Sequence, residues 1–148
     1  MSSKFNLKQQ FQQNLLAILS IAIAISALAY NSWRNEQSEE NRNLRAAGFE
    51  IMKESARLQY LVDSITYASS NDPIKQQDTP IVGWVTVNQI VSLSQLMMPE
   101  VKGDAEQLKL VWSEHWQDLA DDEAANEKVS IANQRLVDRV RNQLTSLK

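Results

Sequence analysis

The chain contains no cysteine, a single histidine, and three glycines and three prolines among its 148 residues. Without cysteine, the protein has no disulfides, thiolate metal sites or cysteine nucleophiles. The glycines, at positions 48, 83 and 103, are isolated, so the chain has no glycine-rich phosphate loop and no Gly-x-Ser-x-Gly nucleophile elbow. We therefore expect a protein that is not an enzyme and holds no cofactor.

The only histidine, His115, also gives little support to metal chemistry. Glu114 and Asp118 lie close in sequence, but the chain offers no second imidazole and no thiolate. Di-iron bundle enzymes need a glutamate three residues before the histidine, and that position is Trp112. We interpret His115 as a residue at a bundle surface or helix interface and expect no metal site, although a pH-sensing role is physically open.

Basic character is limited as well. After Tyr30 the chain has thirteen Lys or Arg residues and eighteen Asp or Glu residues, which disfavours binding to nucleic acid. A small group of cations near the C-terminus is interpreted as complementing the dipole of a last helix. This group comprises Arg135, Arg139, Arg141 and Lys148.

What the chain does contain is a long uncharged segment, residues 9–33. Its strictly apolar part, 15–30, would extend about 24 Å as a helix, slightly less than a hydrocarbon core of roughly 30 Å. Including residues 11–33 gives about 34 Å and places aromatic rings at both boundaries. The pattern predicts one transmembrane helix over 11–33. Its large side chains are Phe11, Leu15, Leu16, Ile18, Leu19, Ile21, Ile23, Ile25, Leu28, Tyr30 and Trp33.

A cleaved signal peptide is the main alternative. Lys4 and Lys8 would form its basic region, residues 15–25 its apolar region, and 27–29 an Ala-Leu-Ala cleavage site. A retained anchor is favoured because the segment before the apolar region is long and no proline or glycine precedes the cleavage site. A buried core helix is disfavoured because the segment is apolar on all faces, and so small a domain is unlikely to bury all of them.

The orientation of the predicted anchor is not decided by charge, since Lys4 and Lys8 oppose Arg34, Arg42 and Arg45. A short tail, one apolar segment and a larger domain form the usual layout of a signal anchor. We therefore expect a single-pass protein of the bacterial inner membrane, with its C-terminal domain in the periplasm.

The composition predicts an all-α fold: a tail (1–10), the anchor (11–33), a polar connector (34–43) and a three- to four-helix bundle (44–148). The connector is either a solvated helical continuation or a flexible link. A helix over 44–68 has an apolar stripe that suits a bundle or a short parallel coiled coil, with Glu54 interrupting it. Its heptad positions are Leu44, Ile51, Leu58 and Ile65.

Turn residues predict a loop over 69–80, followed by an extended segment at 81–83 and a helix over 84–97 that Pro99 ends. Asp104 and Gln107 predict the start of the next helix as a capping box. The acidic run 121–123 predicts the boundary of the last helix. Short connections between these helices favour an up-and-down bundle.

Aromatic residues are the one candidate for a binding surface. Trp112 and Trp116 are one helical turn apart and are expected to stack. The set either anchors the core or forms a hydrophobic groove for a partner or an apolar ligand. Its members are Trp84, Met97, Met98, Trp112, His115 and Trp116.

These features lead us to expect an accessory, scaffolding or regulatory subunit that binds another membrane or envelope protein, with homo-oligomers as an option. The alternative is a ligand-sensing helical domain, because the layout resembles bacterial sensor ectodomains in general outline, without a specific motif. Such a sensor would need a separate signalling partner, since only residues 1–10 precede the predicted anchor. A soluble enzyme released by cleavage after Ala29 is disfavoured by the missing catalytic groups.

Overall fold

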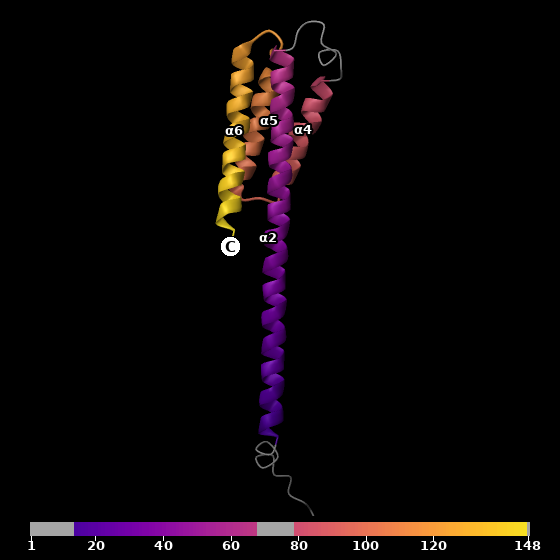
Figure 1. Cartoon of the computed structure of the whole chain (residues 1–148), viewed down its shortest axis with the longest axis vertical. Coiled ribbons are helices and arrows are strands. Elements are labelled where there is room, and N and C mark those ends of the chain that lie inside the picture. Colours follow the sequence, from indigo (N-terminus) through magenta and orange to yellow (C-terminus); the bar gives the residue numbers. More distant parts are fainter. Residues whose placement is uncertain (1–13, 68–78, 148) are drawn as a thin grey trace, which may run out of the picture. The chain divides into compact units, whose positions relative to one another are not determined.

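The computed structural model describes residues 14–67 and 79–147, and the predicted all-α fold is confirmed. The described residues form helices joined by turns, without a strand. In chain order the helices are α2 (Leu15–Tyr67), α4 (Thr79–Ser94), α5 (Pro99–His115) and α6 (Glu123–Ser146), as labelled in Figure 1. The chain divides into two units, one up to Glu40 and one from Asn41.

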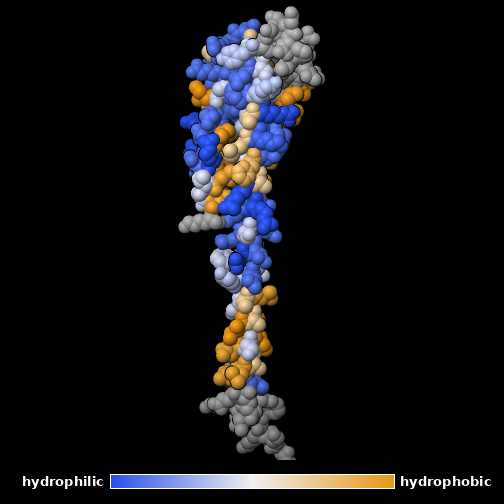
Figure 2. Space-filling view, in the orientation of Figure 1, coloured by the Kyte–Doolittle hydropathy of each residue, from blue (hydrophilic) through white to orange (hydrophobic). Residues whose placement is uncertain are grey.

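In the first unit, α2 is long and apolar enough to cross a membrane. All of its residues from Leu15 to Glu40 are exposed, so the interpretation as a buried core helix is wrong. Figure 2 shows the apolar side chains as an orange band. The Ser20 and Ser26 hydroxyls donate to the carbonyls one turn earlier, at 2.7 and 2.8 Å, so neither needs an external partner. Phe11 lies outside the described residues.

The predicted connector, residues 34–43, is helical throughout. Of the two alternatives, the helical one is therefore observed and the flexible one is wrong. The local reason is that no proline or glycine occurs in this stretch, so every residue can make the backbone hydrogen bonds of a helix.

In the second unit, the C-terminal part of α2 packs with α4, α5 and α6 around one apolar core (Figure 1). The stripe predicted on α2 contributes Ile51 and Leu58, both with no exposed surface. The stripe is therefore buried within this chain, as a bundle requires. The largest fully buried side chains of the other helices are Val87, Ile90, Val101, Leu108, Trp112, Val129, Leu136 and Val140.

Two predicted helix starts were wrong. Helix α4 begins at Thr79 rather than Trp84, and residues 81–83 are helical instead of extended. The β-branched side chains there suggested an extended chain, but packing against α5 outweighs this weak local preference. Helix α5 begins at Pro99, which stands at its first position, so Pro99 starts a helix rather than ending one. Asp104 is accordingly inside α5 and does not cap it.

The predicted boundary before the last helix is correct. Asp122 is the N-cap of α6, and its Oδ1 accepts a hydrogen bond from the Ala124 amide at 2.9 Å. The proposed role of the C-terminal arginines is wrong, because the last turn of α6 contains no basic residue. Arg139 instead pairs with Asp104, and Arg141 pairs with Asp138. Lys148 lies outside the described residues.

The contact between α4 and α5 depends on Gly83. The six-membered ring of Trp112 lies where a Cβ atom at position 83 would be. The Trp84 ring packs edge-on against the same indole, with centroids 6.4 Å apart and planes at 86°. Glycine therefore lets α4 approach the largest side chain of the core.

The contact between α2 and α6 is crossed by polar side chains. Asn126 Nδ2 donates to Asp63 Oδ1 and to Thr66 Oγ1, each at 3.1 Å. Gln59 Nε2 donates to Ser130 Oγ at 2.7 Å, and further along, Asn133 Nδ2 donates to the Ser55 carbonyl at 2.9 Å. The residue numbers rise on α2 as they fall on α6, so these two segments are antiparallel.

Candidate functional site

The predicted aromatic and methionine surface does not form one site. Trp112 is fully buried and Met97 is 5 % exposed, so both belong to the core. Trp84 and Trp116 are half-buried. The ring that packs against Trp112 is Trp84 of α4, whereas the predicted partner was Trp116. The interpretation of these residues as core therefore holds for Trp112 and Met97.

The other two members of that set, Met98 and His115, also keep exposed surface. Met98 is 50 % exposed and is the N-cap of α5, where its amide donates to Gln143 Oε1 at 3.1 Å. His115 is half-buried at the last residue of α5. His115 lines a cavity that none of the other predicted surface residues lines.

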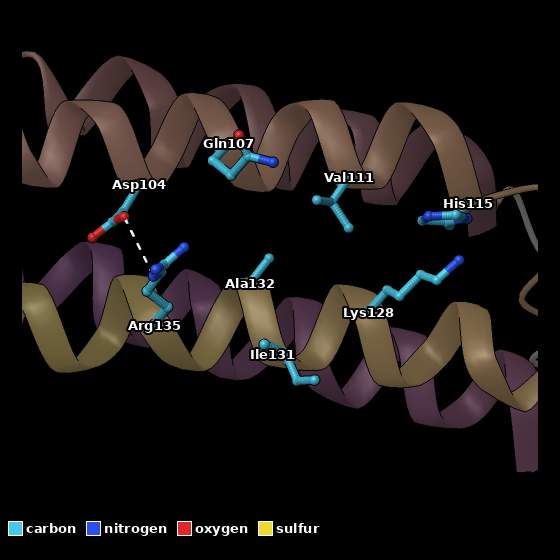
Figure 3. Close-up of a pocket in the computed structure, with 8 residues that line it drawn as sticks. All are labelled: Asp104, Gln107, Val111, His115, Lys128, Ile131, Ala132 and Arg135. Atoms are coloured by element: carbon cyan, nitrogen blue, oxygen red, sulfur yellow. Dashed lines mark ion pairs between the residues drawn. The ribbon is translucent and has the colours of Figure 1, made fainter.

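That cavity is a groove of about 250 Å³ between α5 and α6 (Figure 3). It combines an apolar middle with charged groups toward both ends. Among the residues that the structure describes, its lining comes from these two helices alone. The lining residues are Asp104, Gln107, Val111, His115, Lys128, Ile131, Ala132 and Arg135.

Helical spacing brings these side chains to one groove. On α5, Asp104, Val111 and His115 are separated by seven and four residues, which places them on one face. On α6, the spacing from Lys128 through Ile131 and Ala132 to Arg135 does the same. Because α5 and α6 are antiparallel, Asp104 lies near Arg135 and His115 near Lys128, as Figure 3 shows. Sequence analysis found the individual helices but not this pairing.

At one end of the groove, Asp104 is held by two arginines. Its Oδ2 accepts a hydrogen bond from Arg139 Nε at 2.9 Å, and its Oδ1 is 3.9 Å from Arg135 Nε. The Asp104 side chain is only 13 % exposed. The hydrogen bond and the negative charge of Asp104 raise the pKa of Arg139 above its usual value. Asp104 therefore pairs mainly with Arg139, and its contact with Arg135 is longer.

At the other end of the groove, Lys128 and His115 lie near fewer carboxylates. His115 Nε2 is 3.9 Å from Glu114 Oε2, and that carboxylate is 68 % exposed on its own helix. Among the described residues, Lys128 has no carboxylate within ion-pair distance. The end near Lys128 therefore offers a positive charge to a bound anion.

Within the described ranges, no group of three or more His, Asp or Glu side chains is placed to hold a metal ion. In comparisons with models of protein families, with curated proteins and with solved structures, no match was found for this chain.

Proposed function

We propose that this protein is a single-pass membrane subunit whose helical domain binds another protein of the same membrane. The assignment to a membrane rests on the exposure of the apolar part of α2. From Leu15 to Trp33 no side chain is buried, and Leu16 and Leu28 are 79 % and 68 % exposed. At roughly 25 cal/mol per Å² of apolar surface, such a helix is far more stable in lipid than in water.

Local chemistry supports the same assignment. A membrane-spanning helix must satisfy its polar groups internally, and the Ser20 and Ser26 hydroxyls do so through carbonyls of their own helix. Tyr30 and Trp33 end the apolar segment with ring centroids 6.1 Å apart, and such amphipathic rings favour the membrane boundary. We place the protein in a bacterial inner membrane with the bundle on the periplasmic side, as a retained signal anchor would have it.

The proposal that the bundle binds a protein partner rests on α4 and the turn that follows it. Residues 79–99 contain no charged side chain, although the second unit as a whole is rich in charge. Ile81 and Val85 of α4 are 62 % and 57 % exposed, and Leu96 beyond it is 60 % exposed. Depletion of charge around exposed apolar side chains is the compositional mark of a protein interface.

The test is native extraction of the full-length protein in lipid nanodiscs, followed by mass spectrometry of whatever remains bound. A stoichiometric membrane protein and an intact N-terminal segment are expected. Val85→Lys should abolish the association, because a charge would enter the centre of the contact. Leu110→Lys on α5, where Leu110 is 56 % exposed, is the matched control and should retain the partner.

Recovery of the intact protein alone and monomeric would overturn the partner hypothesis. A soluble species that begins at Tyr30 would instead overturn the anchor. A reporter fused to the C-terminus that is active only in the cytoplasm would overturn the periplasmic orientation.

A second candidate function, binding of a small ligand by the bundle, is favoured by one specific observation. The groove between α5 and α6 is apolar in the middle and carries a lysine without an ion-pair partner among the described residues. Direct titration of the full-length protein with a small ligand would test this role.

A further inference from the structure

We propose that the groove between α5 and α6 binds a small amphipathic carboxylate, with its anionic group on Lys128 and its apolar chain over Ile131. This inference rests on the second candidate function and not on the protein partner.

The apolar middle of the groove is the first argument. Ile131 is 62 % exposed although it lines a cavity, and the neighbouring Ala132, which also lines it, is only 9 % exposed. Val111 completes this surface from α5. An apolar ligand chain would remove the Ile131 side chain from water, which is favourable at roughly 25 cal/mol per Å².

The charges decide which end binds the anion. Near Arg135, the Asp104 carboxylate is close enough to repel an incoming anion, and it already occupies Arg139. Near Lys128 the groove is lined by His115, whose nearest carboxylate, Glu114, is largely exposed to solvent. A carboxylate is therefore expected at the Lys128 end, where its attraction is least opposed.

The dimensions limit the ligand. Lys128 and Arg135 are seven residues apart on α6, which corresponds to about 10 Å along the helix. The volume of about 250 Å³ is below the range of roughly 300–1,000 Å³ that is usual for drug-sized ligands. A short-chain carboxylate fits both limits.

The experiment uses the full-length protein in nanodiscs of uncharged lipid, with ¹³C-labelled isoleucine and alanine methyl groups. Hexanoate is the probe, and neutral hexanamide is the matched probe without charge. Saturable shifts of the Ile131 and Ala132 signals are expected with hexanoate. Hexanamide should bind about three- to fivefold more weakly, as expected for loss of one exposed ion pair.

Two variants test whether Lys128 is the residue that binds the carboxylate. Lys128→Gln should weaken hexanoate binding about three- to fivefold and leave hexanamide binding unchanged. Arg141→Gln is the matched control, because Arg141 lies on the same helix, pairs with Asp138 and does not line the groove. Both substituted side chains lie at the surface, and unchanged signals from the core alanines Ala105 and Ala125 would confirm the fold.

Three outcomes would overturn the inference. The first is equal binding of hexanoate and hexanamide, which would indicate apolar partitioning. The second is an effect of Arg141→Gln as large as that of Lys128→Gln, which would indicate that hexanoate responds to the overall positive charge of α6 and not to Lys128. The third is a response of the isoleucines between 18 and 25 without Ile131, which would indicate binding in lipid. None of these outcomes bears on the pull-down of a protein partner, so the two proposals fail separately.

Discussion

The α4–α5 and α2–α6 contacts specify helix pairing by different physical means. Between α4 and α5, a glycine admits the Trp112 ring, so the contact depends on steric fit. Between α2 and α6, hydrogen bonds such as those from Asn126 to Asp63 and Thr66 pair particular residues. A steric contact fails when atoms are added, whereas a polar contact fails when a partner is removed.

The polar contact is also heterogeneous. Asn126 uses both ends of its amide, because its Oδ1 accepts from Ser130 Oγ at 3.0 Å. Asn133 donates to the Ser55 carbonyl, but its Oδ1 is buried without a hydrogen-bond partner. A buried polar group stabilises a fold only to the extent that it is hydrogen-bonded. The two asparagines should therefore respond differently to substitution.

The largest expected effect is that of Gly83→Ala. Its Cβ atom would overlap the rigid Trp112 ring, so α4 would have to move away from α5. We expect a loss of about 3 kcal/mol in the free energy of unfolding, measured by denaturant titration of tryptophan fluorescence. The double variant Gly83→Ala/Trp112→Leu should be more stable than the sum of the two single losses predicts. Strict additivity would show that this contact is not the cause.

Next in size is Asn126→Ala, which tests the polar contact. It removes the hydrogen bonds that Asn126 donates to Asp63 and Thr66 and the one it accepts from Ser130, in a region where Asn126 itself is 6 % exposed. We expect a loss of about 2 kcal/mol, measured in the same titration. Asn142→Ala, at an exposed position of the same helix, is the control and should change little. A loss at Asn126 no larger than the control's would mean that these hydrogen bonds add no net stability.

A smaller effect of opposite sign is expected for Gly103→Ala. This glycine is exposed inside α5, and a Cβ atom there would meet nothing within 4 Å. Replacing it should stabilise the bundle by about 0.5–1 kcal/mol, because alanine loses less conformational entropy in a helix. A raised midpoint of denaturation would show that replacing a helical glycine by alanine does not in itself destabilise the bundle. The loss expected for Gly83→Ala would then come from the overlap with Trp112. Destabilisation here would contradict the steric explanation.

The smallest expected effect is that of Asn133→Leu. The substitution loses the hydrogen bonds that Asn133 donates to the Ser55 carbonyl and, at 3.4 Å, to Gln59 Oε1, but it also removes an unpartnered buried oxygen and adds apolar volume. These terms should nearly cancel and leave stability within about 0.5 kcal/mol of the original. A loss comparable to that at Asn126 would show that both asparagines contribute equally to the α2–α6 contact.

Periodicity and capping made part of the bundle predictable. The seven-residue spacing of Ile51 and Leu58 predicted a buried face, and both are fully buried. The acidic run predicted the start of α6, where Asp122 caps the first turn. Both signals are local, because they depend on residues within two turns of one helix.

Proline and the β-branched run were misread because their local meaning is ambiguous. Proline is as compatible with the first position of a helix as with its end, so Pro99 alone did not show which applied. The run from Ile81 resembles a strand, but in the folded domain it is the start of α4, packed on α5 through Gly83. Local preferences of this kind are weak beside the burial of a tryptophan.

By itself, the sequence determined the helical class, the apolar segment, the face of α2 that is buried and the boundary before α6. These depend on composition and on spacing along one helix, which need no knowledge of neighbours. Only the tertiary structure decided that Gly83 admits Trp112, that Arg139 pairs with Asp104 and that Lys128 lines a groove with Ile131. Each of these depends on which helix faces which and in what register, and those relations arise from packing the whole core together.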